Sequence, residues 1–276
     1  MISAKILLDS YNVDAKTRLT TFELTFPRFI LAEINTHRTL SRNAASSRAI
    51  PFSKMAEAVA NNPVFPVEWG RNQPGMKAEE ILSQEDTKAA RDLWIHARDY
   101  AVEYAEKLYK LGVHKQIVNR LLEPWMWCTT ITSATNWNNF FKLRAHKAAQ
   151  PEFRTLAFAI LEAYRKSVPD QKHFGDVHAP LVAPEEMLEW GDINLIMKVS
   201  TARCARVSYV RHLEKRDVNA DITLHDRLLS SGHLSPFEHV ATALSNRVTY
   251  GNFAGWRQYR KELSNESGEN FDIGSI

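Results

Sequence analysis

Cysteine is scarce in this sequence, since only Cys128 and Cys204 occur among 276 residues. Two thiols are too few for the disulfide framework of a small secreted domain or for a four-cysteine zinc site. Neither has a histidine nearby in sequence to activate it, so we interpret both as buried structural thiols. The sequence also lacks the glycine-rich dinucleotide fingerprint, the P-loop and the serine-hydrolase elbow, which excludes the commonest motifs for nucleotide binding and acyl transfer.

Long apolar runs and a strong charge of one sign are absent as well. No stretch approaches the ~18 apolar residues of a membrane span, and residues 1–9 lack the basic start of a signal peptide. Lys and Arg number 35 against 32 Asp and Glu, a formal charge of +3. The composition, 44% hydrophobic with 10 glycines and 11 prolines, is typical of a globular protein. We therefore expect a cytoplasmic protein with neither a membrane nor a nucleic-acid partner.

The hydrophobic pattern predicts an α+β fold. Residues 5–8 and 18–26 are predicted as strands, and a short apolar helix at 29–34 follows Pro27. Residues 51–76 are predicted as a long loop with one helical turn, and helices are expected at 77–111, 151–166, 192–207 and 221–231. No clean linker interrupts the chain, so we expect a single domain over residues 1–276. The long helix is predicted to bury one face formed by Ala90, Leu93, Trp94, Ala97, Ala101, Tyr104, Leu108 and Leu111.

Residues 36–48 hold a dense group of hydrogen-bond donors. Three arginines, one histidine, one asparagine and several hydroxyl side chains lie within thirteen positions. Guanidinium forks and short hydroxyls are the donors that a phosphate or a carbonyl-rich heterocycle needs. The pattern therefore indicates an anion or nucleotide site, with a solvated basic face as the alternative.

A second polar segment surrounds a rigid proline. His233, Ser235, Glu238 and His239 flank Pro236 in residues 231–239. The two histidines are six positions apart around the proline, a spacing that matches no common zinc site. We therefore predict no metal here and keep packing at a strand start as the alternative.

A third segment, residues 136–150, combines aromatic and polar side chains. Asn139 and Arg144 are about a turn and a half apart on a helix. The aromatic residues between them are suited either to a flat ligand ring or to the core. Both interpretations stay open at this point.

Together these segments resemble the flavin-dependent thymidylate synthase family, often called ThyX. The family motif Arg-His-Arg, followed by seven residues and a serine, is similar to Thr36-His37-Arg38 with Ser46 and, two positions on, Arg48. The family's His-x-(Thr/Ser)-Pro-x-Glu-His element resembles residues 233–239, and its Asn-x-x-x-x-Arg helix resembles residues 139–144. Its Ala-Ala-Arg-Val-Ser element resembles residues 202–208. The four matches leave out only about residues 51–88 and 167–194.

The order of these elements differs from that in the family. The elements at 202–208 and 233–239 come first there, whereas they come last here, so the chain resembles a circular permutation with its break before the strand that leads to His37. Residues 258–267 resemble a second, decayed copy of the Arg-His-Arg segment. We interpret this overlap as a trimmed tandem duplication, which predicts a strand and helix at 251–269 repeating residues 20–48. Chance similarity is the alternative.

Several positions depart from the family pattern. Thr36 replaces the first arginine, Ala44 stands where a glutamate is usual, and Glu33 stands where a glutamine is common. Residues 133–135 lack the Asn-x-Arg found at the start of the family's arginine helix, and Glu266 is a candidate for the missing carboxylate. These changes bear on the substrate more than on the fold.

The resemblance implies a ThyX-like α+β fold with a mixed sheet and long helices, and it implies reductive methylation of dUMP at C5. Methylenetetrahydrofolate would supply the carbon, and FAD reduced by NADPH would supply the hydride, at sites assembled across a homotetramer. Arg144 and Ser46 are the implied catalytic residues. The implied nucleotide-binding residues are Glu33, Ser46, Ser47, Arg48, Arg120 and Arg144, and the implied flavin-binding residues are His37, Arg38, Asn43, Asn139, Ser208, His233, Ser235 and Glu238.

Two other functions stay open. A hydroxymethylase acting on dCMP or dUMP would use water in place of the final hydride, and the carboxylate of Glu33 would accept from the exocyclic amine of cytosine. A nucleotide-binding protein that lost catalysis is the other alternative, because an arginine and a glutamate of the family motif are replaced in this sequence.

Overall fold

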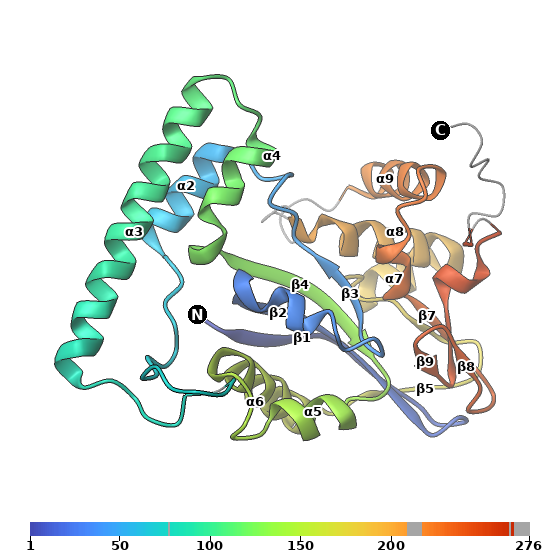
Figure 1. The fold of residues 1–276 in the computed structure, drawn as a ribbon. Helices are drawn as coiled ribbons and strands as arrows, with labels where there is room; N and C mark the ends of the chain where they lie inside the picture. The colour runs from blue at the N-terminus through green and yellow to red at the C-terminus, as the bar shows by residue number, and fades with distance from the viewer. Residues whose placement is uncertain (77, 209–216, 265, 268–276) are drawn as a thin grey trace.

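The computed structural model describes residues 1–76, 78–208, 217–264 and 266–267 (Figure 1). Its first sheet has the strand order β3-β4-β2-β1-β5, in which β1 and β5 are parallel and the other pairs antiparallel. A second sheet has the order β6-β7-β10-β8-β9. The predicted α+β fold with mixed sheets is confirmed. The strands are β1 (Ser3–Asn12), β2 (Thr17–Pro27), β3 (Ser41–Ala44), β4 (Trp127–Ala134), β5 (Asp170–Lys172), β6 (Val177–His178), β7 (Ala241–Ala243), β8 (Thr249–Tyr250), β9 (Phe253–Ala254) and β10 (Trp256–Gln258).

The helices form three groups around the first sheet (Figure 1). Beside the sheet lie α2 (Phe52–Asn61), α3 (Gln84–Lys110), α4 (Lys115–Val118) and the 3-10 helix η2 (Asn119–Trp125). One face of the sheet is covered by α5 (Asn138–Arg144) and α6 (Pro151–Lys166), and the short η1 (Arg28–Ile30) and α1 (Leu31–Ile34) follow β2. The C-terminal group comprises α7 (Pro184–Trp190), α8 (Ile193–Ala205), η3 (Arg206–Ser208), α9 (Val218–Ser230), η4 (Ser235–Glu238) and η5 (Tyr259–Glu262).

The central strand β2 has two buried faces of different chemistry. Phe22, Leu24 and Phe26 point to α5 and α6 and form the main apolar core with aromatic residues of those helices. The alternate residue Leu19 joins a core of the second sheet that contains Trp256. A strand with one side chain in each direction can serve two cores in this way. Strand β2 therefore lies between the helices on one face and the C-terminal elements on the other.

A β-bulge in β1 changes which residues face the C-terminal elements. The pairing register between β1 and β2 shifts between Ile6 and Leu8, so that Ile6 is opposite Phe22 and Leu8 is opposite Thr21. A single inserted residue turns the following side chains to the other face of a sheet. Ser10, opposite Leu19, is consequently placed on the face that meets the second sheet.

Five buried polar side chains connect that face of the first sheet to the C-terminal elements. Ser10 Oγ and Nδ1 of His178 are 2.8 Å apart, and Nε2 of His178 lies 2.8 Å from Thr21 Oγ1. Thr21 Oγ1 is 2.6 Å from Ser133 Oγ, which is 2.9 Å from Nδ1 of His239. Burial lowers the pKa of both histidines to about 3. Both rings are therefore neutral at physiological pH.

The tip of the β1–β2 hairpin is also attached to the second sheet. The Asn12 side chain accepts from the backbone N–H groups of Asp14 and Ala15 and donates to the carbonyls of Leu244 and Gly255, at 2.9 and 2.8 Å. Gly255 has a φ of +75°, and a Cβ there would lie 2.4 Å from Thr17 Oγ1. This close approach, together with the positive φ, requires glycine.

Most predicted elements are confirmed, with corrections in the helical layer. The strands at 5–8 and 18–26 extend to Ser3–Asn12 and Thr17–Pro27, and the helix at 151–166 has the predicted bounds. The predicted loop at 51–76 is wrong over α2, because Phe52, Met55, Ala56 and Val59 form a buried helical stripe at i, i+3, i+4 and i+7. The prolines and asparagines that follow this helix hid its pattern.

The long helix also differs from its prediction. It begins at Gln84, where Ser83 caps the helix by accepting from Asp86 N–H. The predicted inward face is wrong in part, because Leu93 and Tyr104 are exposed, and so is Leu111, which caps the end of the helix. The face that packs on α2 and η2 contains Ala105 together with Trp94, Ala101 and Leu108 of the predicted face.

The C-terminal tail shows a strand followed by a helix, although both are short. β10 has three residues and η5 has four, against eleven residues in β2. The order matches the predicted repeat of residues 20–48, whereas the lengths differ strongly. The duplication therefore stays a prediction. No helix in the described ranges is long and apolar enough to cross a membrane.

The two buried histidines predict a pH dependence of stability. Their folded-state pKa of about 3 lies below the unfolded value near 6.5, so the unfolded chain binds more protons below pH 6.5. The unfolding free energy should fall as pH drops from 6.5 toward 3, by up to about 1.4 kcal/mol per pH unit for each histidine. Urea unfolding across this range measures the slope.

A matched pair of variants separates the buried histidines from other titrating groups. His239→Asn keeps a polar group near the position of Nδ1 and should lower the slope by about one histidine's share, that is ~1.4 kcal/mol per pH unit. His173→Gln, at an exposed histidine, should leave the slope unchanged. Equal slopes for wild type and His239→Asn would contradict the assignment.

Candidate active site

Arg144 meets His37 at the end of α5. The Nε of Arg144 donates to Nε2 of His37 at 2.9 Å, and the guanidinium lies over the Phe153 ring with 4.5 Å between Cζ and the ring centre. His37 packs edge-on against Phe140 and Phe153. The two segments that the sequence resemblance put in one site, residues 36–48 and 136–150, are therefore in direct contact.

His37 is held as a neutral acceptor. Its side chain is buried, and burial, followed by the charges of Arg144 and Arg42, lowers its pKa to about 4. Because Nε2 accepts from Arg144, the proton of the neutral ring belongs on Nδ1. The imidazole thus fixes one edge of the guanidinium. Within the described residues, the two terminal amino groups of Arg144 have no hydrogen-bond acceptor.

Arg42, on β3, binds the backbone of the loop that carries His37. Its guanidinium donates to the carbonyl of His37 and, at 3.3 Å, to the carbonyl of Asn35. Burial lowers the pKa of Arg42, while the nearby carboxylate of Glu238 opposes that shift. Glu238 is also paired with Arg260 of η5 at 2.6 Å. The C-terminal tail therefore contributes a cation beside the Glu238 carboxylate.

Asn43 joins the predicted site to two C-terminal elements. Its Nδ2 donates to the carbonyl of Cys204 at 2.9 Å, and its Oδ1 accepts from Ser235 Oγ at 3.4 Å. Cys204 lies in the last turn of α8, and Ser235 begins η4. Residues more than 160 positions apart in the chain are thus brought to one place. The segments at 202–208 and 233–239 are both next to β3.

A second cluster lies at the other end of residues 36–48. One carboxylate oxygen of Glu123 receives Arg120 at 2.7 Å, Arg28 at 3.5 Å and Ser47 Oγ at 3.5 Å. Ser47 is buried, and its carbonyl accepts from Asn119 at 2.7 Å. The predicted phosphate residues Ser47 and Arg120 are therefore together, with Glu123 between them. Sequence reasoning missed Arg28 and Glu123.

The remaining predicted residues lie around these two clusters. Arg38, Arg48, Asn139 and His233 are exposed. Ser46 accepts from Arg48 N–H at 3.3 Å, and His233 is 2.9 Å from Ser231 Oγ. Ser208 ends η3, and its side chain lies outside the described part of the structure. Glu266 is paired within the tail to Arg260 and Lys261, at 3.3 and 2.8 Å.

Glu33 has an orphaned oxygen. Its Oε2 is buried, and no hydrogen-bond donor among the described residues reaches it. A buried acceptor without a donor is costly, so such an atom indicates a missing water or ligand. Glu33 lies on α1, one turn before His37. The unpaired oxygen therefore indicates a water or ligand at Glu33.

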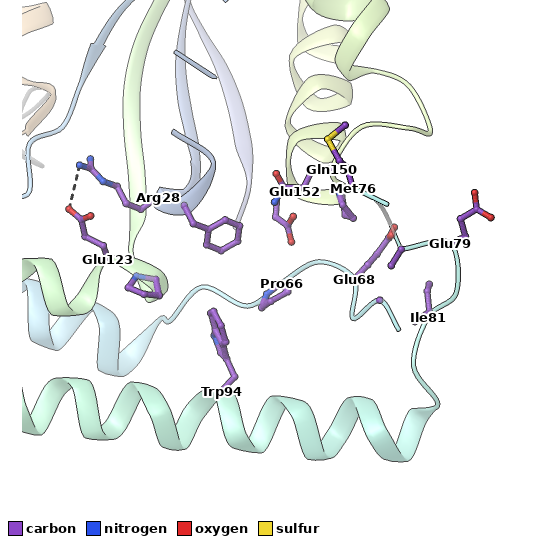
Figure 2. Close-up of a pocket in the computed structure, with 15 residues that line it drawn as sticks. Arg28, Pro66, Glu68, Met76, Glu79, Ile81, Trp94, Glu123, Gln150 and Glu152 are labelled. Carbon is purple, nitrogen blue, oxygen red and sulfur yellow. Dashed lines mark ion pairs between the residues drawn. The ribbon is translucent and has the colours of Figure 1, made fainter. Parts of the chain in front are cut away.

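Arg28 and Glu123 also line one side of a cavity of about 670 Å³ (Figure 2). Trp94 of α3 and Phe29 give it aromatic surface, and the buried Glu152 accepts from the N–H of Val67 at 2.8 Å. No motif in the sequence pointed to it, because its walls come from η1, η2, α3, α6 and residues within 66–76 and 78–81. In the described residues, no group of three His, Cys, Asp or Glu side chains is arranged to hold a metal ion.

Comparison with solved structures identifies the fold. The UMP/dUMP methylase PolB from Streptomyces cacaoi, in its crystal structure bound with 5-Br dUMP, aligns with 60% of this chain and 90% of its own at 17% identity and a TM-score of 0.51. Its structure bound with 5-Br UMP aligns with 60% and 89%, at 17% identity and a TM-score of 0.49. At this identity the first alignment defines a shared α+β fold.

The family follows from the sequence itself. The model of the thymidylate synthase complementing protein family matches residues 17–170, more than half of the chain. The chain therefore belongs to this family, which is the flavin-dependent thymidylate synthase family that its motifs resemble. A search of curated proteins finds no match.

The His37–Arg144 contact predicts an energetic coupling between the two residues. In a double-mutant cycle with His37→Ala and Arg144→Ala, we expect a coupling free energy of about 1–2 kcal/mol, because the charged hydrogen bond is partly buried. Urea unfolding of the four proteins measures it.

The neighbouring Arg38 supplies the control cycle. Arg38 is exposed and Arg144 donates to His37 instead, so Arg38→Ala with Arg144→Ala should give a coupling within about 0.5 kcal/mol of zero. Equal coupling in the two cycles would show that the His37–Arg144 bond contributes nothing specific.

Proposed function

We propose that this chain transfers a one-carbon unit from methylenetetrahydrofolate to C5 of a pyrimidine deoxynucleotide, with dUMP giving dTMP as the leading reaction. The observation that carries the proposal is the Arg144 guanidinium, held by a neutral His37 over Phe153 with its terminal amino groups open. Membership of the family and the UMP/dUMP methylase with the same fold support it.

Arg144 would act on the pyrimidine ring. Its two open amino groups are suited to the edge that carries O2 and N3, where a donor favours the anionic, enolate-like ring and makes C5 nucleophilic. Because His37 is neutral, it holds the guanidinium without neutralising its charge. Ser46, Ser47, Arg48 and Arg120 would hold the 5′-phosphate through hydroxyl and guanidinium donors.

Exposed donors on either side of β3 fit a flavin. Arg38, His233, Ser235 and Asn139 present polar groups at the surface, and Asn43 lies between residues 36–48 and η4. Phosphate and carbonyl oxygens of FAD are the acceptors that such donors suit. We propose that these residues, with His37, Ser208 and Glu238, form the FAD site. When bound, the flavin reduced by NADPH would supply the hydride.

We also propose that the chain is a single permuted ThyX-like domain that assembles into a homotetramer. The family match at 17–170 contains the Thr36-His37-Arg38 motif and the arginine helix, whereas residues 202–208 and 233–239 lie after it. The hydrogen bonds from Asn43 to Cys204 and Ser235 support a common site for both parts. Exposure of Arg38, Arg48 and His233 in one chain supports sites shared between subunits.

The orphaned Glu33 oxygen favours a second candidate, a hydroxymethylase for dCMP. A buried carboxylate oxygen accepts from the amino group of cytosine, whereas O4 of uracil would repel it. In the hydroxymethylase reaction, water would replace the hydride of the final step. The family's first motif arginine and a glutamate are replaced by Thr36 and Ala44. These replacements motivate a third candidate, a nucleotide-binding protein without catalysis.

Absorption spectra and product analysis test these proposals together. A bound oxidised-flavin spectrum with FAD, followed by dTMP from dUMP, is the expected result. A hydroxymethylated product from dCMP would favour the second candidate, and Glu33→Gln should then shift the preference toward dUMP. The absence of flavin binding, even with FAD and nucleotide in excess, would refute the enzyme and leave a binding protein.

We expect kcat to depend strongly on Arg144. Arg144→Ala is expected to lower kcat by about 10²–10³-fold, the usual loss for one preorganised donor to a developing anion. Arg144→Lys should recover only part of the rate, because lysine lacks the planar fork. Lys142→Ala, at an exposed position of the same helix, is the control and should keep the full rate. Similar losses in both alanine variants would exclude this role.

A further inference from the structure

The cavity that Arg28 and Glu123 line lies outside the proposed nucleotide and flavin sites. Among the described residues that form its wall, none is assigned to the nucleotide, to the flavin or to catalysis. Its volume of about 670 Å³ is within the range of small-molecule sites in proteins, about 300–1,000 Å³. The chemistry of the wall therefore indicates which kind of ligand the cavity would accept.

Glu152 is the most buried charged side chain in this wall. It is 4% exposed and lies in the first turn of α6, where the partial positive charge of the helix N-terminus favours a carboxylate. Its Oε1 accepts from the N–H of Val67 at 2.8 Å, and no donor among the described residues reaches Oε2. A buried carboxylate oxygen without a donor is costly, so Oε2 indicates a donor supplied by a ligand or a water.

The charged groups of the wall disfavour an anion. The described lining residues include four carboxylates and one guanidinium, namely Glu68, Glu79, Glu123, Glu152 and Arg28. Glu123 is 3.5 Å from Arg28, and Glu68 is paired with a neighbouring arginine of α6. The other two carboxylates have no cation beside them in the described part of the chain. A phosphate would be repelled here, whereas N–H donors or a positive charge would be attracted.

The apolar part of the wall suits a flat ring. Trp94 comes from α3 and Glu152 from α6, and Pro66 lies on the segment between these helices (Figure 2). Phe29 and Pro124 add further flat apolar surface. Aromatic side chains favour stacked or edge-on contacts with planar groups. A planar heterocycle with N–H donors along one edge therefore matches both the rings and the carboxylate.

We propose that this cavity binds a flat, uncharged or cationic heterocycle whose edge carries an amino group beside a ring N–H, with Oε2 of Glu152 as the acceptor. Guanine nucleosides and pterins both present such an edge, and a carboxylate is the acceptor that two adjacent donors suit. The site is distinct from that of the proposed reaction and does not depend on it.

Two matched pteridines test the acceptor. Pterin carries the amino group, and lumazine carries a carbonyl in its place on a ring of the same shape. In equilibrium dialysis the wild type should bind pterin at least about tenfold more tightly than lumazine, because Oε2 would repel the carbonyl oxygen. Equal affinities, or no binding of pterin, would overturn the proposal.

Guanosine, measured in the same way, assigns the source of the ligand. Binding tighter than that of pterin would identify a nucleoside as the ligand class, and weaker binding would identify a pterin. Both results keep the amino-bearing edge as the recognised group.

Glu152→Gln reverses the hydrogen bonding at the open position. Glutamine keeps an oxygen for the N–H of Val67 and turns the open acceptor into an NH2 donor. We expect pterin affinity to fall about tenfold and lumazine to become the tighter ligand. Glu79→Gln removes an exposed carboxylate of the wall and should change either affinity by less than about twofold. An unchanged preference in a folded Glu152→Gln protein would overturn the role of Glu152, and the wild-type comparison decides the proposal if this variant does not fold.

Competition separates the cavity from the proposed active site. Excess dUMP or FAD should leave pterin binding unchanged, because none of their proposed residues lines the cavity. Displacement of pterin by either would place it in the proposed active site and overturn the proposal. Flavin and nucleotide binding, measured without pterin, show whether the proposed function fails independently.

Discussion

The pairing of β2 with β4 is the contact on which the rest of the structure depends. Eight residues of β2 are in register with β4, from Thr20 opposite Ala134 to Pro27 opposite Trp127. β4 leads directly into α5 and Arg144, while η1 and α1 carry the chain from β2 back along the sheet. β3 then starts beside the end of β4, with Ser41 opposite Ser133. His37 consequently reaches Arg144 although 107 positions separate them.

The same strand pair also fixes the C-terminal elements. Thr21 and Ser133 point to the face opposite the apolar core, where each also contacts a buried histidine. These hydrogen bonds join β6 and the segment after η4 to the first sheet, although Nε2 of His239 has no partner among the described residues. Residues 202–208 and 233–239 are thereby held beside β3.

The three arginines of the candidate site differ in how far their positive charge is neutralised by a partner. Arg144 meets a neutral imidazole, Arg42 meets backbone carbonyls with Glu238 nearby, and Arg120 meets Glu123. The guanidinium that faces the proposed base therefore keeps its full charge, whereas the one at the proposed phosphate is already paired. Glu123 accepts from all of the donors in its cluster, which explains how three cationic or polar groups stay in one place.

Short-range sequence patterns were enough to predict many of the strands and helices and to identify the family. Alternation identified β1 and β2, helical periodicity identified α6, α8 and α9, and the spacing of Thr36-His37-Arg38, Ser46 and Arg144 pointed to the family that the sequence match confirms. Such features depend on neighbours within a few turns of chain, so the sequence by itself determined them.

Long-range packing decided the rest. The bulge in β1, the neutral His37 beneath Arg144, the Glu123 cluster and the orphaned oxygen of Glu33 arise from contacts between distant segments. The limit of prediction from sequence is clearest for helix α3, because its two apolar stripes are adjacent and equally periodic. Only the position of α2 and η2 decided that Trp94, Ala101 and Leu108 pack inward and that Leu93, Tyr100 and Leu111 face outward.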